Sequence, residues 1–239
     1  MDRKVFEFIE NLAPLTDAAS VTNAMGELLE QHGIDHFCLS FLPGPNQSYD
    51  DVAIENRMPD GYVPTYIEKQ YTQDDPVFHH CKTTVLPFRW YKETPIDPER
   101  QPRAVEVVRL ARDFGMVDGV VVPVASAAGR MGQVWFGGRE FDLPEYKLPA
   151  LHLMAHYAFD RLLRLKGVPS QPEHPLSPRE REVLTFVALG MTSAAIAARL
   201  SITERTVIAH IAHCCRKLGA ATRTQAVAIA VRDGIIQPW

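Results

Sequence analysis

Residues 176–236 read "LSPREREVLTFVALGMTSAAIAARLSITERTVIAHIAHCCRKLGAATRTQAVAIAVRDGII", and this stretch decides the fold of the C-terminal part of the chain. Ser177 followed by Pro178 is a typical helix start, because a serine hydroxyl caps free backbone N–H groups and proline lacks one. Thr203 begins another helix, and Gly190 and Gly219 end helices. These signals predict four helices, over residues 179–190, 193–200, 204–219 and 222–234. A short second helix, a tight turn and a longer third helix indicate a helix-turn-helix.

The charge of the chain is unevenly distributed. The 239 residues carry a net charge of −4, but residues 176–239 contain eight Lys and Arg against four Asp and Glu. The first 175 residues contain 17 basic against 25 acidic residues. A basic terminal unit on an acidic body indicates that the small unit meets a polyanion.

A linker is expected at residues 166–175, "KGVPSQPEHP", which hold three prolines and almost no large apolar residue. Proline removes backbone donors and disfavours helix in the residue before it. The chain is therefore expected to consist of a domain over residues 1–165, this linker, and a second domain over residues 176–239.

The larger domain mixes both kinds of secondary structure. Helical spacing of apolar residues predicts helices over residues 5–12, 18–32, 100–114 and 144–166. Short β-branched or aromatic runs predict strands at 37–42 and 117–125, and 129–138 fits a hairpin turn that leads into a third. The fold class is therefore α+β: an N-terminal α-β-α sandwich on an antiparallel sheet, followed by an all-α four-helix helix-turn-helix domain.

Composition narrows the cellular setting. No run of 18 apolar residues is present, so no membrane partner is expected. The first residues carry acids within their apolar stretch, unlike a signal peptide. Four scattered cysteines are most simply free thiols in a reducing compartment, and a cytoplasmic location is expected.

The C-terminal stretch resembles the DNA-binding domain of the LuxR, FixJ and NarL families over its full length. Glu180, Leu184 and Gly190 match at the family's spacing, as do the "TSAAIA" turn, the "TVIAH" core of the third helix and the "KL" before the last helix. A generic helical bundle is the alternative, in which Val207 and Ile211 are core residues and nothing more. The number of matched positions favours DNA binding.

The resemblance implies two sets of DNA contacts. Side chains that donate to phosphates would fix the register of the protein on DNA without reading the DNA sequence. These side chains are Thr192, Ser193 at the start of the second helix, Thr206, His210, Lys217 and Arg223. The outward positions of the third helix would meet base edges, and these are Ile208, Ala209, Ala212, His213 and Arg216. Apolar side chains at 208 and 212 would read thymine methyl groups. The fourth helix would pair with a twin domain, so the expected partner is double-stranded DNA with an inverted repeat, bound by a homodimer.

The N-terminal domain has a resemblance of its own. Residues 58–90, "MPDGYVPTYIEKQYTQDDPVFHHCKTTVLPFRW", are similar to the autoinducer-binding domain of LuxR-type acyl-homoserine lactone receptors. The matches are Tyr66, the pair Asp75 and Pro76, and Trp90. Further along the chain, "FGMVDGVVVPV" at 114–124 matches a second stretch of the same family's pattern. A phosphorylated receiver domain is excluded by the absence of acidic residues at the ends of the predicted strands.

The resemblance implies a site for an N-acyl-homoserine lactone. A buried carboxylate only accepts hydrogen bonds, so Asp75 suits the ligand's amide N–H, a charge-assisted bond contributing roughly 1.5–3 kcal/mol. Trp90 suits the lactone ring, and Tyr62 and Tyr66 supply hydroxyl groups four residues apart. The expected contacts are completed by positions that depart from the family pattern or flank Asp75, namely Met58, Val77 and Trp135. The bulk of Trp135 favours a short, branched or aromatic acyl group.

Other interpretations of the same residues remain open. Asp75 also suits the start of a helix, and Trp90 and Trp135 also suit an apolar core. His79 and His80 are adjacent, so their side chains point about 100° apart on a helix and make poor joint metal ligands. No metal, cofactor or catalytic residue is therefore expected. The alternatives are a ligand-independent dimeric regulator of the same family and, as an enzyme, a lactone-processing hydrolase that would use Cys81.

Overall fold

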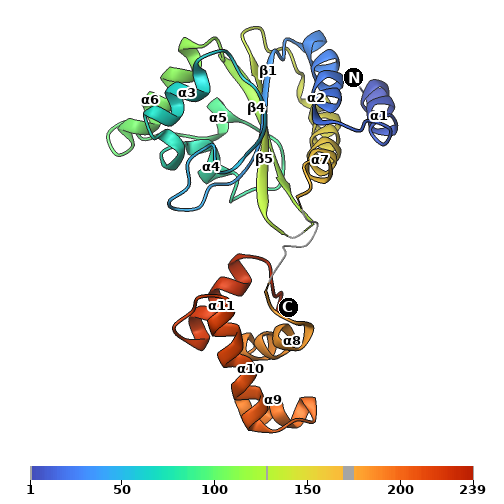
Figure 1. Ribbon diagram of the computed structural model, residues 1–239. Coiled ribbons are helices and arrows are strands. Elements are labelled where there is room, and N and C mark those ends of the chain that lie inside the picture. Colours follow the sequence, from blue (N-terminus) through green and yellow to red (C-terminus); the bar gives the residue numbers. More distant parts are fainter. Residues whose placement is uncertain (1, 128, 169–174, 239) are drawn as a thin grey trace. The chain divides into compact units, whose positions relative to one another are not determined.

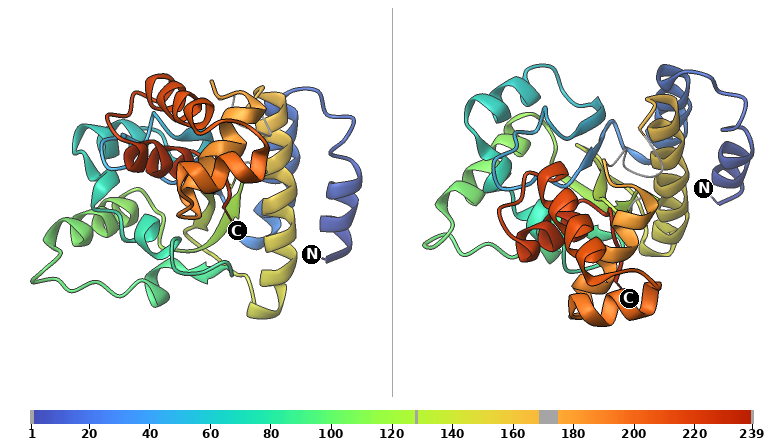
Figure 2. Two further views of the ribbon diagram at one scale, coloured as in Figure 1. Left: turned by 90° about the horizontal axis from the view of Figure 1, so that it is seen from below. Right: turned by 60° about the horizontal axis from the view of Figure 1, so that its bottom comes forward.

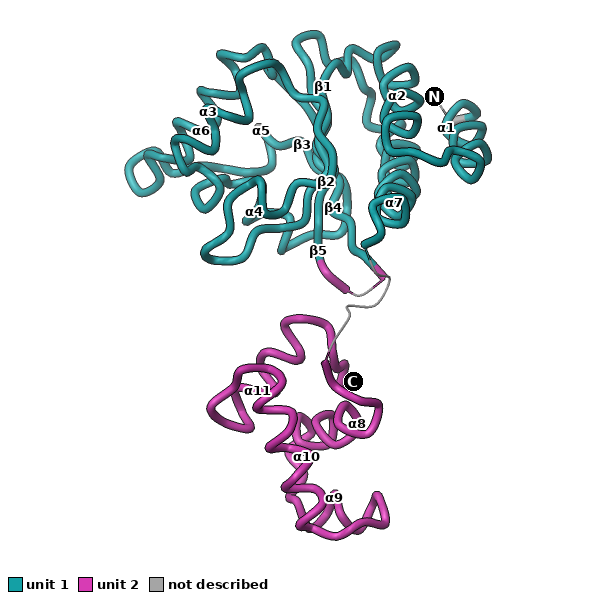
Figure 3. The backbone as a smooth tube through the Cα atoms, viewed as in Figure 1, with its two compact units in different colours: residues 1–126, 131–168 teal, residues 127–130, 169–239 magenta. Residues whose placement is uncertain are grey.

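The computed structural model describes residues 2–127, 129–168 and 175–238. By its contacts the chain divides into two compact units, residues 1–126 with 131–168 and residues 127–130 with 169–239 (Figure 3). Most of the predicted linker, residues 169–174, lies outside the described residues. No helix in the described ranges is long and apolar enough to span a membrane.

The first unit is built on a five-stranded sheet in the order β2-β1-β5-β4-β3 (Figure 1). All four strand pairs are antiparallel. The strands are β1 His36–Phe41, β2 Ala53–Arg57, β3 Phe88–Arg89, β4 Asp118–Ala125 and β5 Met131–Gly138. The register places Trp135 of β5 between Cys38 of β1 and Val121 of β4. Since side chains alternate along a strand, these three residues lie on one face of the sheet.

Helices α1 Asp2–Glu10, α2 Ala18–Leu29 and α7 Leu148–Leu165 lie on one side of this sheet (Figure 1). Figure 2 shows the same grouping from two further directions, with α1 and α2 beside the long α7. Their apolar stripes meet the face of the sheet that carries Phe37, Leu39, Val134 and Phe136. This core is closed at its edge by Arg161 of α7, whose guanidinium donates to backbone carbonyls of the α1–α2 connection.

A second helical layer covers the opposite face of the sheet. It consists of α3 Tyr62–Glu68, α4 Pro76–His80, α5 Trp90–Glu93 and α6 Pro102–Asp113 (Figure 1). The apolar core on this side contains Cys38, Trp135 and Val121 from the sheet, together with residues of each of the four helices. Single turns of 3₁₀ helix complete the unit at Glu30–His32, Tyr71–Gln73 and Glu145–Lys147.

The α+β sandwich predicted from the sequence is confirmed, with helices on both faces of an antiparallel sheet. Two strands escape the sequence pattern. β3 is only two residues long, and β2 is an edge strand with a largely exposed "AIENR" sequence, so neither has a hydrophobic run. The predicted helix at 18–32 ends as a 3₁₀ turn after Leu29, and the helix predicted from 144 begins at Leu148.

The second unit contains four helices, α8 Pro178–Ala188, α9 Ser193–Leu200, α10 Glu204–Lys217 and α11 Arg223–Arg232. Each begins at a cap residue, where Ser177, Thr192, Thr203 or Thr222 accepts a hydrogen bond from a backbone N–H in the first turn, and the caps predicted at Ser177 and Thr203 are confirmed. Ser201 ends α9 in the left-handed region at φ 52°, which makes the tight turn between α9 and α10. The predicted four-helix helix-turn-helix is confirmed.

Candidate ligand pocket and nucleic-acid interface

A pocket lies between the sheet and the α3–α6 layer of the first unit. It contains about 580 Å³ of space between atoms, part of it open to solvent. Pockets that bind small molecules are commonly concave and mostly apolar. The lining comes from β1, β5, the segment between β1 and β2, and the helical layer.

The lining residues are Cys38, Tyr49, Met58, Tyr62, Val63, Tyr66, Asp75, Pro76, Val77, Phe78, Trp90, Val107, Val108, Ala111, Gln133 and Trp135. All seven positions expected from the sequence to contact a ligand are among them. Asp75 is the one carboxylate in this lining, and most of the other side chains are apolar or aromatic. The pocket therefore suits a largely apolar molecule that carries a hydrogen-bond donor.

The Asp75 carboxylate is fixed by two hydrogen bonds within the unit. The hydroxyl of Tyr66 donates to Asp75 Oδ2 at 2.8 Å, and the backbone N–H of Val77 donates to Oδ1 at 2.9 Å. The second bond makes Asp75 the N-cap of α4, with Pro76 in the first turn. Asp75 is thus both a helix-start residue and a pocket residue. Burial raises the pKa of Asp75, and the bonds from Tyr66 and Val77 oppose that rise.

Two indole rings form a continuous aromatic wall of the pocket. The rings of Trp90 and Trp135 are 5.4 Å apart between centroids and inclined by 58°. Glycines make room for both: a Cβ on Gly119 would lie 2.4 Å from Trp90 Nε1, and one on Gly137 would lie 2.3 Å from the ring of Trp135. A larger residue at either position would displace an indole, so the glycines are part of the pocket's construction.

Tyrosines line another part of the pocket wall. The ring of Tyr66 is 5.8 Å from that of Tyr62 and 6.0 Å from that of Tyr49. Tyr62 also contacts Phe114 edge-to-face, at 5.7 Å. Packing of this kind holds the rings in place and leaves few rotamers open to them.

Several lining residues were not found from the sequence. They come from the β1–β2 segment (Tyr49), the sheet (Cys38 and Gln133), α3 (Val63), α4 (Pro76 and Phe78) and α6 (Val107, Val108 and Ala111). Gln133 could have been inferred, because it precedes Trp135 by two residues and so shares its face of the strand. No comparable signal marks Tyr49, since its position depends on how a loop folds back over the sheet.

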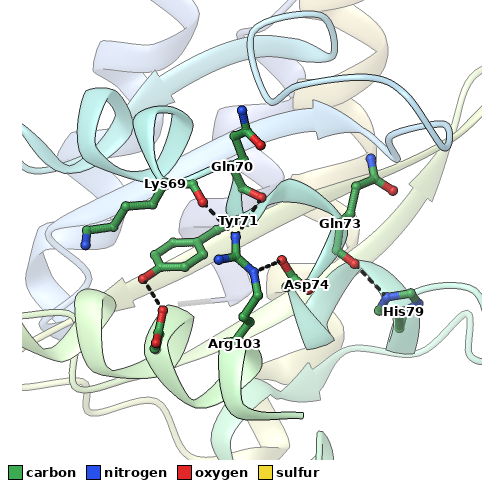
Figure 4. Close-up of polar contacts among 8 residues, drawn as sticks. Lys69, Gln70, Tyr71, Gln73, Asp74, His79 and Arg103 are labelled. Carbon is green, nitrogen blue, oxygen red and sulfur yellow. Dashed lines mark hydrogen bonds and ion pairs between the residues drawn. The ribbon is translucent and has the colours of Figure 1, made fainter.

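The segment that carries Asp75 is fastened to α6 by Arg103 (Figure 4). Arg103 Nε lies 2.6 Å from Asp74 Oδ2, and its Nη2 donates to the carbonyl oxygens of Lys69 at 2.7 Å and Gln70 at 3.3 Å. The same guanidinium lies over the ring of Tyr71, 5.2 Å from the centroid. We call these contacts the Arg103 clamp. It holds the 69–75 segment against the helix that forms part of the pocket wall.

The other reactive side chains near Asp75 have structural roles. His79 Nε2 lies 3.2 Å from the carbonyl oxygen of Gln73, and His80 packs edge-to-face on Phe88 at 4.4 Å. Cys81 is fully buried, and burial raises the pKa of its thiol well above the usual range, which makes it a poor nucleophile. Within the described ranges, no group of three or more His, Cys, Asp or Glu residues could hold a metal ion.

In the second unit, α10 presents an exposed face. All five positions expected from the sequence to meet base edges, residues 208, 209, 212, 213 and 216, are exposed, and Ile208 is 54% exposed. Ile208 and Ala212 give the middle of this face an apolar character. Val207 and Cys214 on the opposite side are buried against the other helices of the unit.

The side chains expected to donate to phosphates differ in whether they already make hydrogen bonds within the unit. The Thr192 hydroxyl accepts from Ala195 N at the start of α9, and Ser193 is the first residue of that helix. The Thr206 hydroxyl is 2.7 Å from that of Thr203. Arg223 donates to the Met191 carbonyl at 3.3 Å, and His210 is partly exposed in the middle of α10.

Lys217 is held by Glu180, at 2.8 Å between Nζ and Oε2. Glu180 is only 4% exposed, and it also accepts from the backbone N–H of Ser177. Burial of Glu180 raises the pKa of its carboxyl, but the bonds from Lys217 and Ser177 lower it more, to about 2. The ion pair links the start of α8 to the end of α10, and His213 lies beside it, 3.8 Å from Glu180 Oε1.

These two sites define a regulator that joins a small-molecule pocket to a helix-turn-helix. Comparison with known families agrees: residues 17–162 match the autoinducer binding domain, and residues 174–230 match the bacterial regulatory proteins of the luxR family. The chain belongs to the LuxR family of quorum-sensing transcriptional regulators.

Relatives and solved structures support this assignment along the whole chain. The transcriptional activator protein BjaR1 of Bradyrhizobium diazoefficiens is 38% identical over 99% of this chain and 97% of its own length. The quorum sensing-dependent regulator RpaR of Rhodopseudomonas palustris is 33% identical, over 98% and 96%. The crystal structure of Escherichia coli SdiA is 25% identical, covers 98% of both chains and superposes with a TM-score of 0.74. A structure of SdiA in complex with octanoyl-rac-glycerol, 24% identical with coverage of 98% and 95%, gives the same TM-score.

Proposed function

We propose that the pocket binds an N-acyl-homoserine lactone and that ligand occupancy is coupled to DNA binding. The observation that carries this proposal is the Asp75 carboxylate, oriented by Tyr66 and Val77 within an otherwise largely apolar lining. Asp75 accepts the amide N–H of the ligand. Trp90 provides a flat apolar surface for the lactone ring, and Tyr62 provides a hydroxyl for the lactone carbonyl. Tyr66 acts by orienting the carboxylate.

The acyl group is short, branched or aromatic. The indole of Trp135 takes up the space beside Trp90 on the floor of the pocket, where a long flexible chain would otherwise lie. Met58 and Val77 complete the apolar surroundings of the acyl group. Preferential binding of a twelve-carbon acyl lactone over short, branched and aryl ones in a competition assay would contradict this assignment.

The chain acts on DNA as a homodimer. Residues 1–165 sense the ligand, residues 166–175 connect, and residues 176–239 bind DNA. Two copies of α10 in successive major grooves call for an inverted-repeat site, and joining two weak half-site contacts raises affinity through effective concentration. A ligand that completes the core of the first domain stabilises the folded protein by mass action.

The test begins with mass spectrometry of small molecules retained by protein purified from cells grown with and without acyl lactones. Retention of an acyl lactone by the wild type and its loss in Asp75→Ala supports the proposal. Asp75→Asn is the matched variant, because it keeps the shape of the side chain and one acceptor oxygen, which can retain the bond from Val77 or from Tyr66, while the charge is removed. Normal ligand sensitivity in Asp75→Ala would refute the pocket assignment.

The alternative is a ligand-independent regulator of the same family. One observation favours it: both oxygens of Asp75 already have partners within the chain. Absence of retained ligand, together with operator binding that no acyl lactone alters, would establish this alternative.

A further inference from the structure

The polar groups that line the pocket differ in whether they already have partners. Tyr66 donates to Asp75, and the Oε1 of Gln133 receives the thiol of Cys81 at 4.0 Å. Tyr49 is different: its side chain is 6% exposed, and the only group that its hydroxyl meets among the described residues is the Cys38 thiol, not a strong oxygen or nitrogen partner. Buried hydroxyl groups nearly always have a good partner, so one in a pocket wall with only a thiol beside it points to a ligand.

Tyr49 is held in place by its ring. It lies in the segment between β1 and β2, and its ring packs edge-to-face on Tyr66 at 6.0 Å. Tyr66 therefore touches both Asp75, through its hydroxyl, and Tyr49, through its ring. The neighbour of the Tyr49 hydroxyl is the Cys38 thiol, which is a weak hydrogen-bonding group.

A phenol hydroxyl in this position acts as a neutral donor. Burial raises the pKa of Tyr49 well above its usual value, and the neighbouring Cys38 raises it further, so the hydroxyl keeps its proton at all physiological pH values. The pocket thus contains an acceptor, Asp75, and a neutral donor, Tyr49, and both are in contact with Tyr66.

We propose that the Tyr49 hydroxyl donates a hydrogen bond to the amide carbonyl oxygen of the bound acyl lactone. This inference rests on the proposed function, in which Asp75 takes the amide N–H and Tyr62 the lactone carbonyl. A trans amide presents its N–H and its C=O in opposite directions, so the carbonyl needs a donor other than the residues around the N–H. Met58 has no donor to offer. Tyr49 is then a specificity-determining residue that selects ligands with an oxygen at this position.

The test compares Tyr49→Phe with Ser40→Ala. Ser40 is the matched control, because its hydroxyl is also fully buried without a described partner but is not part of the pocket lining. Dissociation constants are measured by calorimetry with N-butanoyl- and N-benzoyl-homoserine lactone, and thermal midpoints are measured without ligand. Each probe is paired with its thioamide, in which sulfur, a weaker acceptor, replaces the amide oxygen.

Tyr49→Phe is expected to weaken binding of the amide by roughly 3- to 10-fold, the range of one neutral hydrogen bond, and to remove the difference between amide and thioamide. It is also expected to raise the thermal midpoint of the unliganded protein, because an unsatisfied buried hydroxyl is lost. Ser40→Ala is expected to raise the midpoint and leave binding unchanged.

An unchanged dissociation constant in Tyr49→Phe, or a lowered thermal midpoint, would overturn the inference and leave the proposed function intact. The same holds if Trp135→Phe, and not Tyr49→Phe, removes the thioamide difference, since the indole N–H would then be the donor. Failure of the wild type to bind either lactone would instead refute the proposed function itself, and the inference with it.

Discussion

At the residue scale, Asp75 has a structural role and, in the proposed function, a recognition role as well. Its carboxylate caps α4, receives the Tyr66 hydroxyl and lines the pocket. Because burial raises its pKa, the charged form that accepts an amide N–H is less favoured than in an exposed aspartate. If Asp75 accepts the amide N–H as proposed, ligand binding depends on pH through this residue.

Acyl-lactone affinity is expected to fall at mildly acidic pH, beginning above the range set by the ordinary pKa of 3.8. Protonation of Asp75 removes one of the two acceptor oxygens and the charge that strengthens the bond. Stability without ligand should change in the opposite direction: a carboxyl whose folded pKa is raised takes up its proton more readily when folded, so stability rises as pH falls through the folded pKa. Calorimetry between pH 4.5 and 7.5 measures the first effect, and Asp75→Asn should abolish its pH dependence.

The residues of the pocket could be predicted from the sequence only in part. Asp75, Trp90 and Tyr62 carry distinctive chemistry at recognisable spacing, and the structure brings them to one cavity. Tyr49 and Cys38 carry no such signal. Tyr49 reaches the pocket because a loop folds back over the sheet, and Cys38 because of the pairing register between β1 and β5. Both depend on long-range contacts that a local pattern does not contain.

At the element scale, single ion pairs hold neighbouring segments together in both units. The Arg103 clamp joins the 69–75 segment to α6, and the Glu180–Lys217 pair joins α8 to α10. The helix starts were predictable because each cap lies next to its helix in the sequence. The clamp was not, since 29 residues separate Asp74 from Arg103.

Arg103→Ala is expected to weaken ligand binding several-fold while changing global stability little. The Arg103–Asp74 pair is partly exposed, and solvent screening makes the contribution of such pairs to folding small. Loss of the bonds to the carbonyls of Lys69 and Gln70 nevertheless frees the segment that positions Asp75. Arg100→Ala is the control, because Arg100 is exposed and pairs only with nearby Asp97. Equal dissociation constants for the two variants would show that the clamp does not position the site.

Glu180→Gln is expected to destabilise the DNA-binding unit by roughly 1.5–3 kcal/mol at neutral pH, the contribution of a hydrogen bond to a charged group. The folded pKa of about 2 lies below the ordinary 4.5, so the stabilisation is present above pH 4.5 and is lost as pH falls toward 2. Urea unfolding of the full chain at pH 7 and pH 3 measures this. The wild type should lose stability between these values, and the variant should lose less. An equal loss in both would assign the acid sensitivity to other groups.

At the scale of the whole molecule, opposite charges are separated along the chain. The first 175 residues are acidic and residues 176–239 are basic. Attraction for polyanions is therefore confined to the C-terminal part of the chain. This division was visible in the sequence because charge is additive and needs no knowledge of the fold. The way in which two chains assemble on DNA has no such local signature.

DNA affinity is expected to fall steeply with salt, since each neutralised phosphate releases about 0.9 counterions. Arg223→Ala should reduce the slope of log K against log salt concentration by about 1. It should weaken binding to all DNA sequences by a similar factor. Fluorescence anisotropy over a roughly tenfold range of salt concentration, from about 30 to about 300 mM, gives the slope. Loss of sequence preference with an unchanged slope would mean that Arg223 meets bases rather than phosphates.

The sheet of the first unit divides its interior into two separate apolar cores. The pocket lies in the core on the side of α3–α6, whereas the core beneath α2 and α7 consists of buried apolar side chains. Amide hydrogen exchange should therefore be asymmetric across a single sheet. Protons in α2 and α7 should exchange only through global unfolding, with or without ligand, while those in α3 and α6 should exchange through local opening until a ligand fills their side. One half of the domain would then preserve the architecture at all times, and the other half would report the chemical signal.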